Sequence, residues 1–128
     1  MKVDKIIALI KERVGSNYEL PGWKSHRKMS VIPINSITEK AFIPPKDAKQ
    51  ASVSIILFEE NNQLFFLLTK RTDNVEHHKG QVSLPGGAID KNETAQNASL
   101  RETNEEIGID SSTLKSLGQL SSLSLIHI

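Results

Sequence analysis

Apolar residues recur along this chain at two different spacings, and each spacing predicts one type of element. Near the N-terminus, Val3, Ile6, Ile7, Ile10 and Val14 recur at the spacing of a single helical face. We therefore expect an amphipathic helix over residues 1–15, with this apolar stripe packed against the rest of the protein. The stretch that follows, residues 15–50, is rich in Gly, Pro, Ser and charge, and it predicts an irregular arm.

Two runs of strand-forming residues follow the arm. ASVSIILF (Ala51–Phe58) predicts a buried strand, and QLFFLLTKR (Gln63–Arg71) predicts a second one. The EENN between them predicts a turn, because asparagine tolerates positive φ. We expect the two strands to form a hairpin.

A polar loop, Thr72–Leu84, leads to Pro85, Gly86 and Gly87. Beyond it, Ala95–Ile107 predicts one helix of ordinary length. Thr94 can cap its N-terminus through the hydroxyl, and Gly108 can end it in the left-handed conformation. The LKSLGQL segment, Leu114–Leu120, predicts the start of another strand.

At about 100° per residue, the helix 95–107 separates two kinds of side chain. Leu100, Thr103 and Ile107 cluster on one side, which we expect to face the core. The carboxylates cluster roughly opposite, and the small residues Ala95 and Ala98 lie on the carboxylate side. The clustered carboxylates are Glu102, Glu105 and Glu106.

Composition limits the class of protein. A chain of 128 residues suits a single domain. Lys and Arg number 16 against 15 Asp and Glu, so charge does not favour a nucleic-acid or membrane-surface partner. The lack of cysteine excludes disulfides, thiol nucleophiles and Cys-ligated zinc, and it is compatible with a reducing compartment. We expect a cytoplasmic protein, and the sequence does not indicate its oligomeric state.

The glutamate cluster in RETNEEIG (Arg101–Gly108) has two interpretations. One is a solvated acidic face, since like-charged pairs destabilise a helix by only about 0.2–0.5 kcal/mol each. The other is a site for a divalent cation, for which carboxylate oxygens are preferred ligands. Gly86 and Gly87 favour the second, because glycine lets backbone approach an ion or phosphate closely. An ion pair between Glu93 and Arg101 could join loop to helix and orient Glu102.

The whole stretch Gly87–Ile109 resembles the Nudix box, G-x5-E-x7-R-E-U-x-E-E-x-G-U, where U is aliphatic. The positions that fit are Gly87, Glu93, Arg101, Glu102, Glu105, Glu106, Gly108 and Ile109. Thr103, at the first U position, departs from the pattern on the packing side of the helix. With so many fixed spacings, the resemblance favours the cation site over the solvated face.

The resemblance implies an α/β Nudix fold, a mixed β-sheet sandwiched between helices. It also implies hydrolysis of a diphosphate joined to another moiety, with Mg²⁺ or Mn²⁺. On this basis the implied metal ligands are Glu102, Glu105, Glu106 and the Gly87 carbonyl. The implied catalytic set is Glu102, Glu105, Arg101 and Glu93, in which Arg101 and Glu93 act as support and Glu102 binds metal or orients water.

The stretch Leu67–Gly87 resembles the additional motif of the coenzyme A diphosphatase branch, LLTxR(S/T), then H-x-G-x-(V/I), then FPGG. LPGWKSHRKM in the arm resembles a stretch that precedes the first strand in that branch. Two residues depart: Glu76 replaces an arginine and Leu84 a phenylalanine. The implied reaction splits coenzyme A or acyl-CoA into 3′,5′-ADP and a 4′-phosphopantetheine product, and the implied substrate-binding residues are Arg71, His78, Gly80 and Gly86.

Each of these residues also has a plainer interpretation. His78 in HHKG could simply be exposed, and no partner at metal-ligand spacing supports a zinc site. Arg71 could be a surface charge or a bidentate phosphate clamp, and we favour the clamp. We expect Trp23 in the arm to pack against the protein rather than to serve as a platform for base stacking.

The C-terminus differs from what the resemblance predicts, because Nudix folds continue well beyond the box. LSLIHI (Leu123–Ile128) resembles the translation of a transposon-end adapter used in DNA sequencing. We therefore expect residues 1–122 to form a partial Nudix domain, with helix and arm at 1–50, and 123–128 to be non-native. Two alternatives stay open: a Nudix hydrolase of another nucleoside diphosphate derivative such as ADP-ribose, or a non-catalytic fragment.

Overall fold

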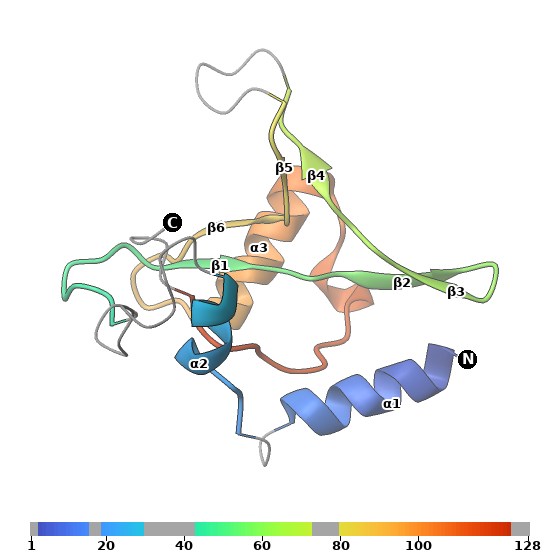
Figure 1. Cartoon of the computed structure of the whole chain (residues 1–128). Helices are drawn as coiled ribbons and strands as arrows, with labels where there is room; N and C mark the ends of the chain where they lie inside the picture. Colours follow the sequence, from blue (N-terminus) through green and yellow to red (C-terminus); the bar gives the residue numbers. More distant parts are fainter. Residues whose placement is uncertain (1–2, 16–18, 30–42, 73–79, 124–128) are drawn as a thin grey trace. The chain divides into compact units, whose positions relative to one another are not determined.

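The computed structural model describes residues 3–15, 19–29, 43–72 and 80–123 of the chain (Figure 1). They belong to two compact units. One comprises Val3–Ala48 with Ser116–Ile128, and the other comprises Lys49–Lys115. The second unit contains the whole of the predicted chemistry.

The helices are α1 (Val3–Val14), α2 (Trp23–His26) and α3 (Ala95–Ile107), with short 3-10 helices at Arg27–Met29 and Ser111–Thr113. The strands are β1 (Ala51–Val53), β2 (Leu57–Glu60), β3 (Gln63–Phe66), β4 (Thr69–Lys70), β5 (Val82–Ser83) and β6 (Gly86–Ala88). This mixture confirms the α/β class. Among the described residues, the strands form three two-stranded antiparallel sheets, β1–β6, β2–β3 and β4–β5.

The first unit contains the predicted N-terminal helix. All five residues of the apolar stripe on α1 are buried or half-buried, whereas Leu9, outside the stripe, is exposed. The arm is more regular than we predicted, because Trp23–Met29 forms α2 and a 3-10 turn. The Arg27 guanidinium lies 5.4 Å from the centre of the Trp23 ring, a cation–π distance.

The predicted hairpin is confirmed. Strands β2 and β3 pair through Glu60 and Gln63, and the turn residues Asn61 and Asn62 have φ of 51° and 60°. Positive φ at both central residues is typical of a type I′ turn, whose backbone twist matches that of the two paired strands. Phe58 and Phe65 stack across the pair, with ring centres 5.6 Å apart.

Three strand predictions were wrong in detail. Gln63–Arg71 is divided into β3 and β4. Ala51–Phe58 is divided into β1 and β2, and its aliphatic side chains are not buried: Val53 and Ile55 are 58% and 50% exposed. The alternation turns the serines of this strand inward instead. No strand forms at Leu114–Leu120, since extended backbone becomes a strand only when a neighbour pairs with it, and no described segment does.

The interior of the second unit lies where α3 packs against β1 and β6 (Figure 1). Its most deeply buried side chains are Ala98, Thr103 and Pro85. The β1–β6 ladder is extended at both ends by backbone bonds, from Ser54 N to Pro85 O (2.8 Å) and from Ile89 N to Gln50 O (3.0 Å). A rigid strand pair therefore supports the helix that carries the carboxylates. Within the described residues, no helix combines the length and apolar character needed to cross a membrane.

Candidate functional site

Helix α3 begins and ends where its capping residues predict. The Thr94 hydroxyl accepts a hydrogen bond from the Asn97 amide (3.1 Å), which satisfies one of the free N–H groups of the first turn. Gly108 adopts φ 71°, and its amide donates to Asn104 O (2.8 Å). These local bonds set the length of the helix and so the positions of its glutamates.

The face of α3 that packs against the strands agrees only in part with the predicted one: Thr103 is buried as predicted, but Leu100 and Ile107 are not fully buried. Ala98 and Thr103 are fully buried, and the Glu102 side chain is only 18% exposed, whereas Leu100 and Ile107 are half-buried. The small residues on the carboxylate side allow the helix to approach β6 closely, so the packed face includes that side. Glu102 consequently lies against the strand rather than in open solvent.

Arg101 and Glu93 form the predicted ion pair. Arg101 Nε and NH2 donate to the two Glu93 carboxylate oxygens, each at 3.0 Å, which is the parallel two-bond geometry that guanidinium and carboxylate favour. Glu93 also accepts from the Asp90 amide at 3.1 Å. The Arg101 bonds, followed by the Asp90 amide, hold the pKa of Glu93 below its ordinary value. The pair joins the loop before α3 to the middle of the helix.

Arg101 also donates hydrogen bonds to three other groups and lies 3.7 Å from the Asp90 carboxylate. NH1 donates to Glu102 Oε1 at 2.8 Å and more weakly to Glu105 at 3.4 Å, and NH2 donates to the Ala88 carbonyl of β6 at 3.1 Å. The hydrogen bonds to Glu93 and then Glu102 raise the pKa of Arg101, which is charged throughout the accessible pH range. One cation therefore orients Glu102 and links strand, loop and helix.

The adjacent glycines of β6 are required for different reasons. Gly86 has φ 155°, and an added Cβ there would overlap the Ser52 carbonyl and come within 2.6 Å of Val53 Cα. At Gly87 an added Cβ would instead come within 2.6 Å of both Glu102 carboxylate oxygens. The first glycine lets two strands meet, and the second leaves room for a carboxylate against the strand.

Two of the three glutamates, Glu102 and Glu106, reach β6 from neighbouring turns of α3. Glu106 Oε2 accepts from the Gly86 amide at 3.3 Å, while Glu105, with a 58% exposed side chain, turns toward Arg101. Among the described residues, no three acidic or histidine side chains converge closely enough to form a metal cage. The structure thus brings Glu102, Glu106, Gly86 and Gly87 together, and the assignment of metal ligands stays a prediction.

Two of the predicted substrate residues, Arg71 and Gly80, lie at the two ends of one loop, whereas Gly86 lies in β6. Arg71 directly follows β4, and its amide donates to Gln81 O at 2.9 Å, so the β4–β5 pair closes the loop between them. The Arg71 side chain is exposed, and Gly80 has φ 65° at the other end of the loop. His78 and Glu76 lie outside the described residues. The roles of Arg71, Gly80 and His78 stay predictions.

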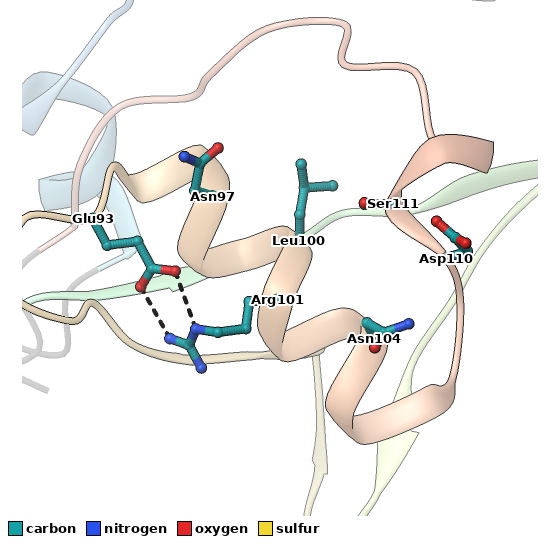
Figure 2. A pocket seen from close by; sticks show the side chains of 7 residues that line it. All are labelled: Glu93, Asn97, Leu100, Arg101, Asn104, Asp110 and Ser111. Carbon is teal, nitrogen blue, oxygen red and sulfur yellow. Dashed lines mark hydrogen bonds and ion pairs between the residues drawn. The ribbon is translucent and has the colours of Figure 1, made fainter.

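A hollow of about 540 Å³ lies along α3 (Figure 2). Along the helix it is lined by Asn97, Leu100, Arg101 and Asn104. Glu93 lines it from the preceding loop, and Asp110 and Ser111 line it from the following 3-10 turn. Asp110 caps that turn by accepting from the Ser112 amide at 2.8 Å, which lowers the pKa of the Asp110 carboxyl. The hollow therefore borders the Glu93–Arg101 ion pair as well as this capped turn.

The contact between Ser54 and helix α3 was not predicted from the sequence. The Ser54 hydroxyl lies 3.3 Å from Thr103 Oγ1 and donates to Ser99 O at 3.4 Å. The alternation of Ser52 and Ser54 with Val53 and Ile55 was the available signal, since period two places both serines on one face. Because Ala51–Phe58 was interpreted as a wholly buried strand, its polar face was not predicted.

The chain is similar to known proteins over the segment that contains these site residues. The family model described as NUDIX domain matches residues 48–124. The chain is 36% identical over 98 residues to "Nudix hydrolase 3" of Caenorhabditis elegans, covering 76% of this chain and 40% of that protein. It is 35% identical over 99 residues to "Nudix hydrolase 22, chloroplastic" of Arabidopsis thaliana, covering 73% and 32% respectively. It is 37% identical over 78 residues to "Uncharacterized Nudix hydrolase NudL" of Klebsiella aerogenes, covering 60% and 64%. The chain thus spans less than half the length of the first two.

Proposed function

This chain belongs to the Nudix domain family, and from that premise we propose that it hydrolyses the diphosphate link of a nucleoside diphosphate derivative. Among such substrates we favour coenzyme A or an acyl-CoA, giving 3′,5′-ADP and the corresponding 4′-phosphopantetheine. The names of the similar proteins from the nematode and from Arabidopsis support the reaction class.

The observation that carries the proposal is the Arg101 bond network. Arg101 bonds to both oxygens of Glu93, to Glu102 and to the carbonyl of Ala88. A solvated acidic face would require none of these bonds. The network orients Glu102 against β6 before any substrate arrives, and preorganised charge of this kind is the main contribution a protein makes to phosphoryl chemistry.

The donor set suits Mg²⁺ or Mn²⁺, since it consists of carboxylate and carbonyl oxygens. The residues that would hold the ion are Glu102, Glu105, Glu106 and the Gly87 carbonyl. When bound, such an ion neutralises diphosphate charge and makes a water molecule more acidic. Gly87 contributes by having no side chain, which leaves the Glu102 carboxylate in place beside the strand. Arg101 contributes by fixing the orientation of the same carboxylate.

The preference for coenzyme A rests on the motif from Leu67 to Gly87. In the described part of that motif, Arg71 is an exposed guanidinium at the end of β4, available for a phosphate. The β4–β5 pairing holds the two ends of the motif loop together, which brings the backbone near Gly80 close to the same end of the sheet. This arrangement fits an anionic substrate that lies beside Arg71 at this end of the sheet.

The test is product analysis on the whole chain with Mg²⁺ or Mn²⁺. We expect coenzyme A to give 3′,5′-ADP, and Glu106→Gln to lower kcat by about 100-fold, the size of effect seen when one preorganised charge interaction is lost. Glu60→Gln makes the same change on an exposed residue of β2 and should leave the rate unchanged. Turnover of ADP-ribose without turnover of coenzyme A would refute the substrate. Hydrolysis of neither, by a folded parent protein, would refute the reaction.

A further inference from the structure

A buried polar residue occupies the one position at which the Nudix box of this chain departs from the family pattern. Thr103 is fully buried although the corresponding position is aliphatic in the pattern. Its hydroxyl donates to Ser99 O at 2.7 Å, one turn earlier in α3, and lies 3.3 Å from Ser54 Oγ. A buried hydroxyl is unfavourable unless it has partners, and this one has two.

The two hydroxyl protons of this cluster serve three close oxygen–oxygen contacts. A hydroxyl has one proton, so Thr103 shares its proton in a three-centre bond between Ser99 O and the more distant Ser54 Oγ. Ser54 also lies 3.4 Å from Ser99 O, to which it donates. No buried side-chain nitrogen or oxygen among the described residues lacks a partner. The pair is therefore a satisfied polar contact between a helix and a strand.

Ser54 connects this contact to the glycine strand. Its backbone amide donates to Pro85 O at 2.8 Å, and the buried Pro85 immediately precedes Gly86. The Gly86 amide in turn donates to Glu106, which lies one turn beyond Thr103 on α3. Ser54 is therefore linked to the two sides of the Gly86–Glu106 contact. Its backbone bonds to Pro85, next to Gly86, and its side chain contacts Thr103, one turn from Glu106.

We propose that Thr103 and Ser54 act as a pair of positioning residues that set the register of α3 against β6. Aliphatic packing is non-directional, so a valine at 103 would allow the helix to shift along or rotate over the strand. Hydrogen bonds weaken steeply away from their preferred distance and angle, so the hydroxyl pair restricts both movements. The consequence for catalysis rests on the proposed function, whereas the consequence for the Gly86–Glu106 contact does not.

The experiment compares Thr103→Val, Thr103→Ser and Ser54→Ala with the parent chain. Valine keeps the shape of threonine and removes the hydroxyl, and serine keeps the hydroxyl and removes the methyl. Thr113→Val is the matched control, because Thr113 makes an equally short bond, 2.7 Å to Asp110 O, on an exposed turn away from β6. The first measurement is amide hydrogen exchange at Gly86, which reports its bond to Glu106 without requiring activity.

We expect Thr103→Val to increase the rate of amide exchange at Gly86 by about tenfold or more. A helix that moves more freely over β6 protects this amide less. Thr103→Ser should restore slow exchange, and Thr113→Val should leave it unchanged. In the hydrolysis assay, Thr103→Val should lower kcat about tenfold with little change in KM, since displaced carboxylates affect the chemical step more than substrate affinity. Thr103→Ser should recover most of this loss.

Unchanged exchange at Gly86 in a folded Thr103→Val protein would overturn the proposal. So would equal effects of Thr103→Val and Thr103→Ser, because packing rather than the hydroxyl would then be responsible. If Thr103→Val does not fold, Ser54→Ala decides, since it removes the same contact from the strand side and should also speed exchange at Gly86. A parent protein that hydrolyses nothing would refute the proposed function and leave the exchange test valid.

Discussion

Alanine at Gly86 and alanine at Gly87 add the same methyl group, yet the structure predicts very different losses of stability. At Gly86 the new Cβ overlaps the backbone of β1, which cannot move without breaking the ladder, and φ 155° is itself unfavourable for alanine. Strain at such a φ is about 1–3 kcal/mol, and overpacking adds about 1–3 kcal/mol. The expected loss in unfolding free energy is therefore about 2–6 kcal/mol, a large part of the stability of a small domain.

At Gly87 the new Cβ meets the far end of the flexible Glu102 side chain instead. The carboxylate can rotate away, so the expected loss is only about 1 kcal/mol, at the lower limit for overpacking. The displaced carboxylate would leave its place beside β6, so Gly87→Ala should impair the proposed hydrolysis more than it impairs folding.

Urea unfolding measures both losses, with the midpoint compared at constant slope. Gly86→Ala should shift the midpoint at least twice as far as Gly87→Ala. Equal shifts, or a larger shift for Gly87→Ala, would refute the assignment of backbone overlap to Gly86 and of side-chain displacement to Gly87. A changed slope in either variant would mean that the compactness of one state had altered, and the comparison would then rest on hydrogen exchange at the β1–β6 amides.

Three further predictions test the elements that support the site. Thr94→Ala removes the N-cap of α3 and should lower the unfolding free energy by about 1 kcal/mol, measured by urea unfolding with Ser112→Ala as an exposed control. Asn62→Ala places alanine at φ 60° and should destabilise by about 1–2 kcal/mol, whereas Asn62→Gly should not; equal effects would contradict the turn geometry. The pKa of Glu93 is lower in the folded protein than its ordinary 4.5, so its contribution to stability is present above that pH and is lost as the pH falls through the folded value. Thermal unfolding from about pH 7 to about pH 3 should therefore depend less steeply on pH in Glu93→Gln, and an unchanged slope would contradict the ion pair.

The local features of the site were predictable because their causes lie within a few residues in sequence. The bounds of α3 depend on a hydroxyl that reaches the third residue after it and on a glycine that adopts positive φ. The hairpin depends on two asparagines between apolar runs. The Glu93–Arg101 pair spans a loop and the first turns of one helix, so its spacing alone brings the partners together.

Features that depend on segments far apart in sequence were decided only by the tertiary structure. Helical periodicity showed that α3 has two faces, but the packed face follows from how closely small residues let the helix approach β6, so Ala98 is buried more deeply than Leu100. The contact between Ser54 and Thr103 joins residues 49 positions apart, and no local pattern specifies such a partner. By itself the sequence determined which groups are available for the chemistry and how they are spaced along the helix. The packing of α3 on β1 and β6 decided which of those groups meet, because side chains on separate elements come into contact only when the chain has folded.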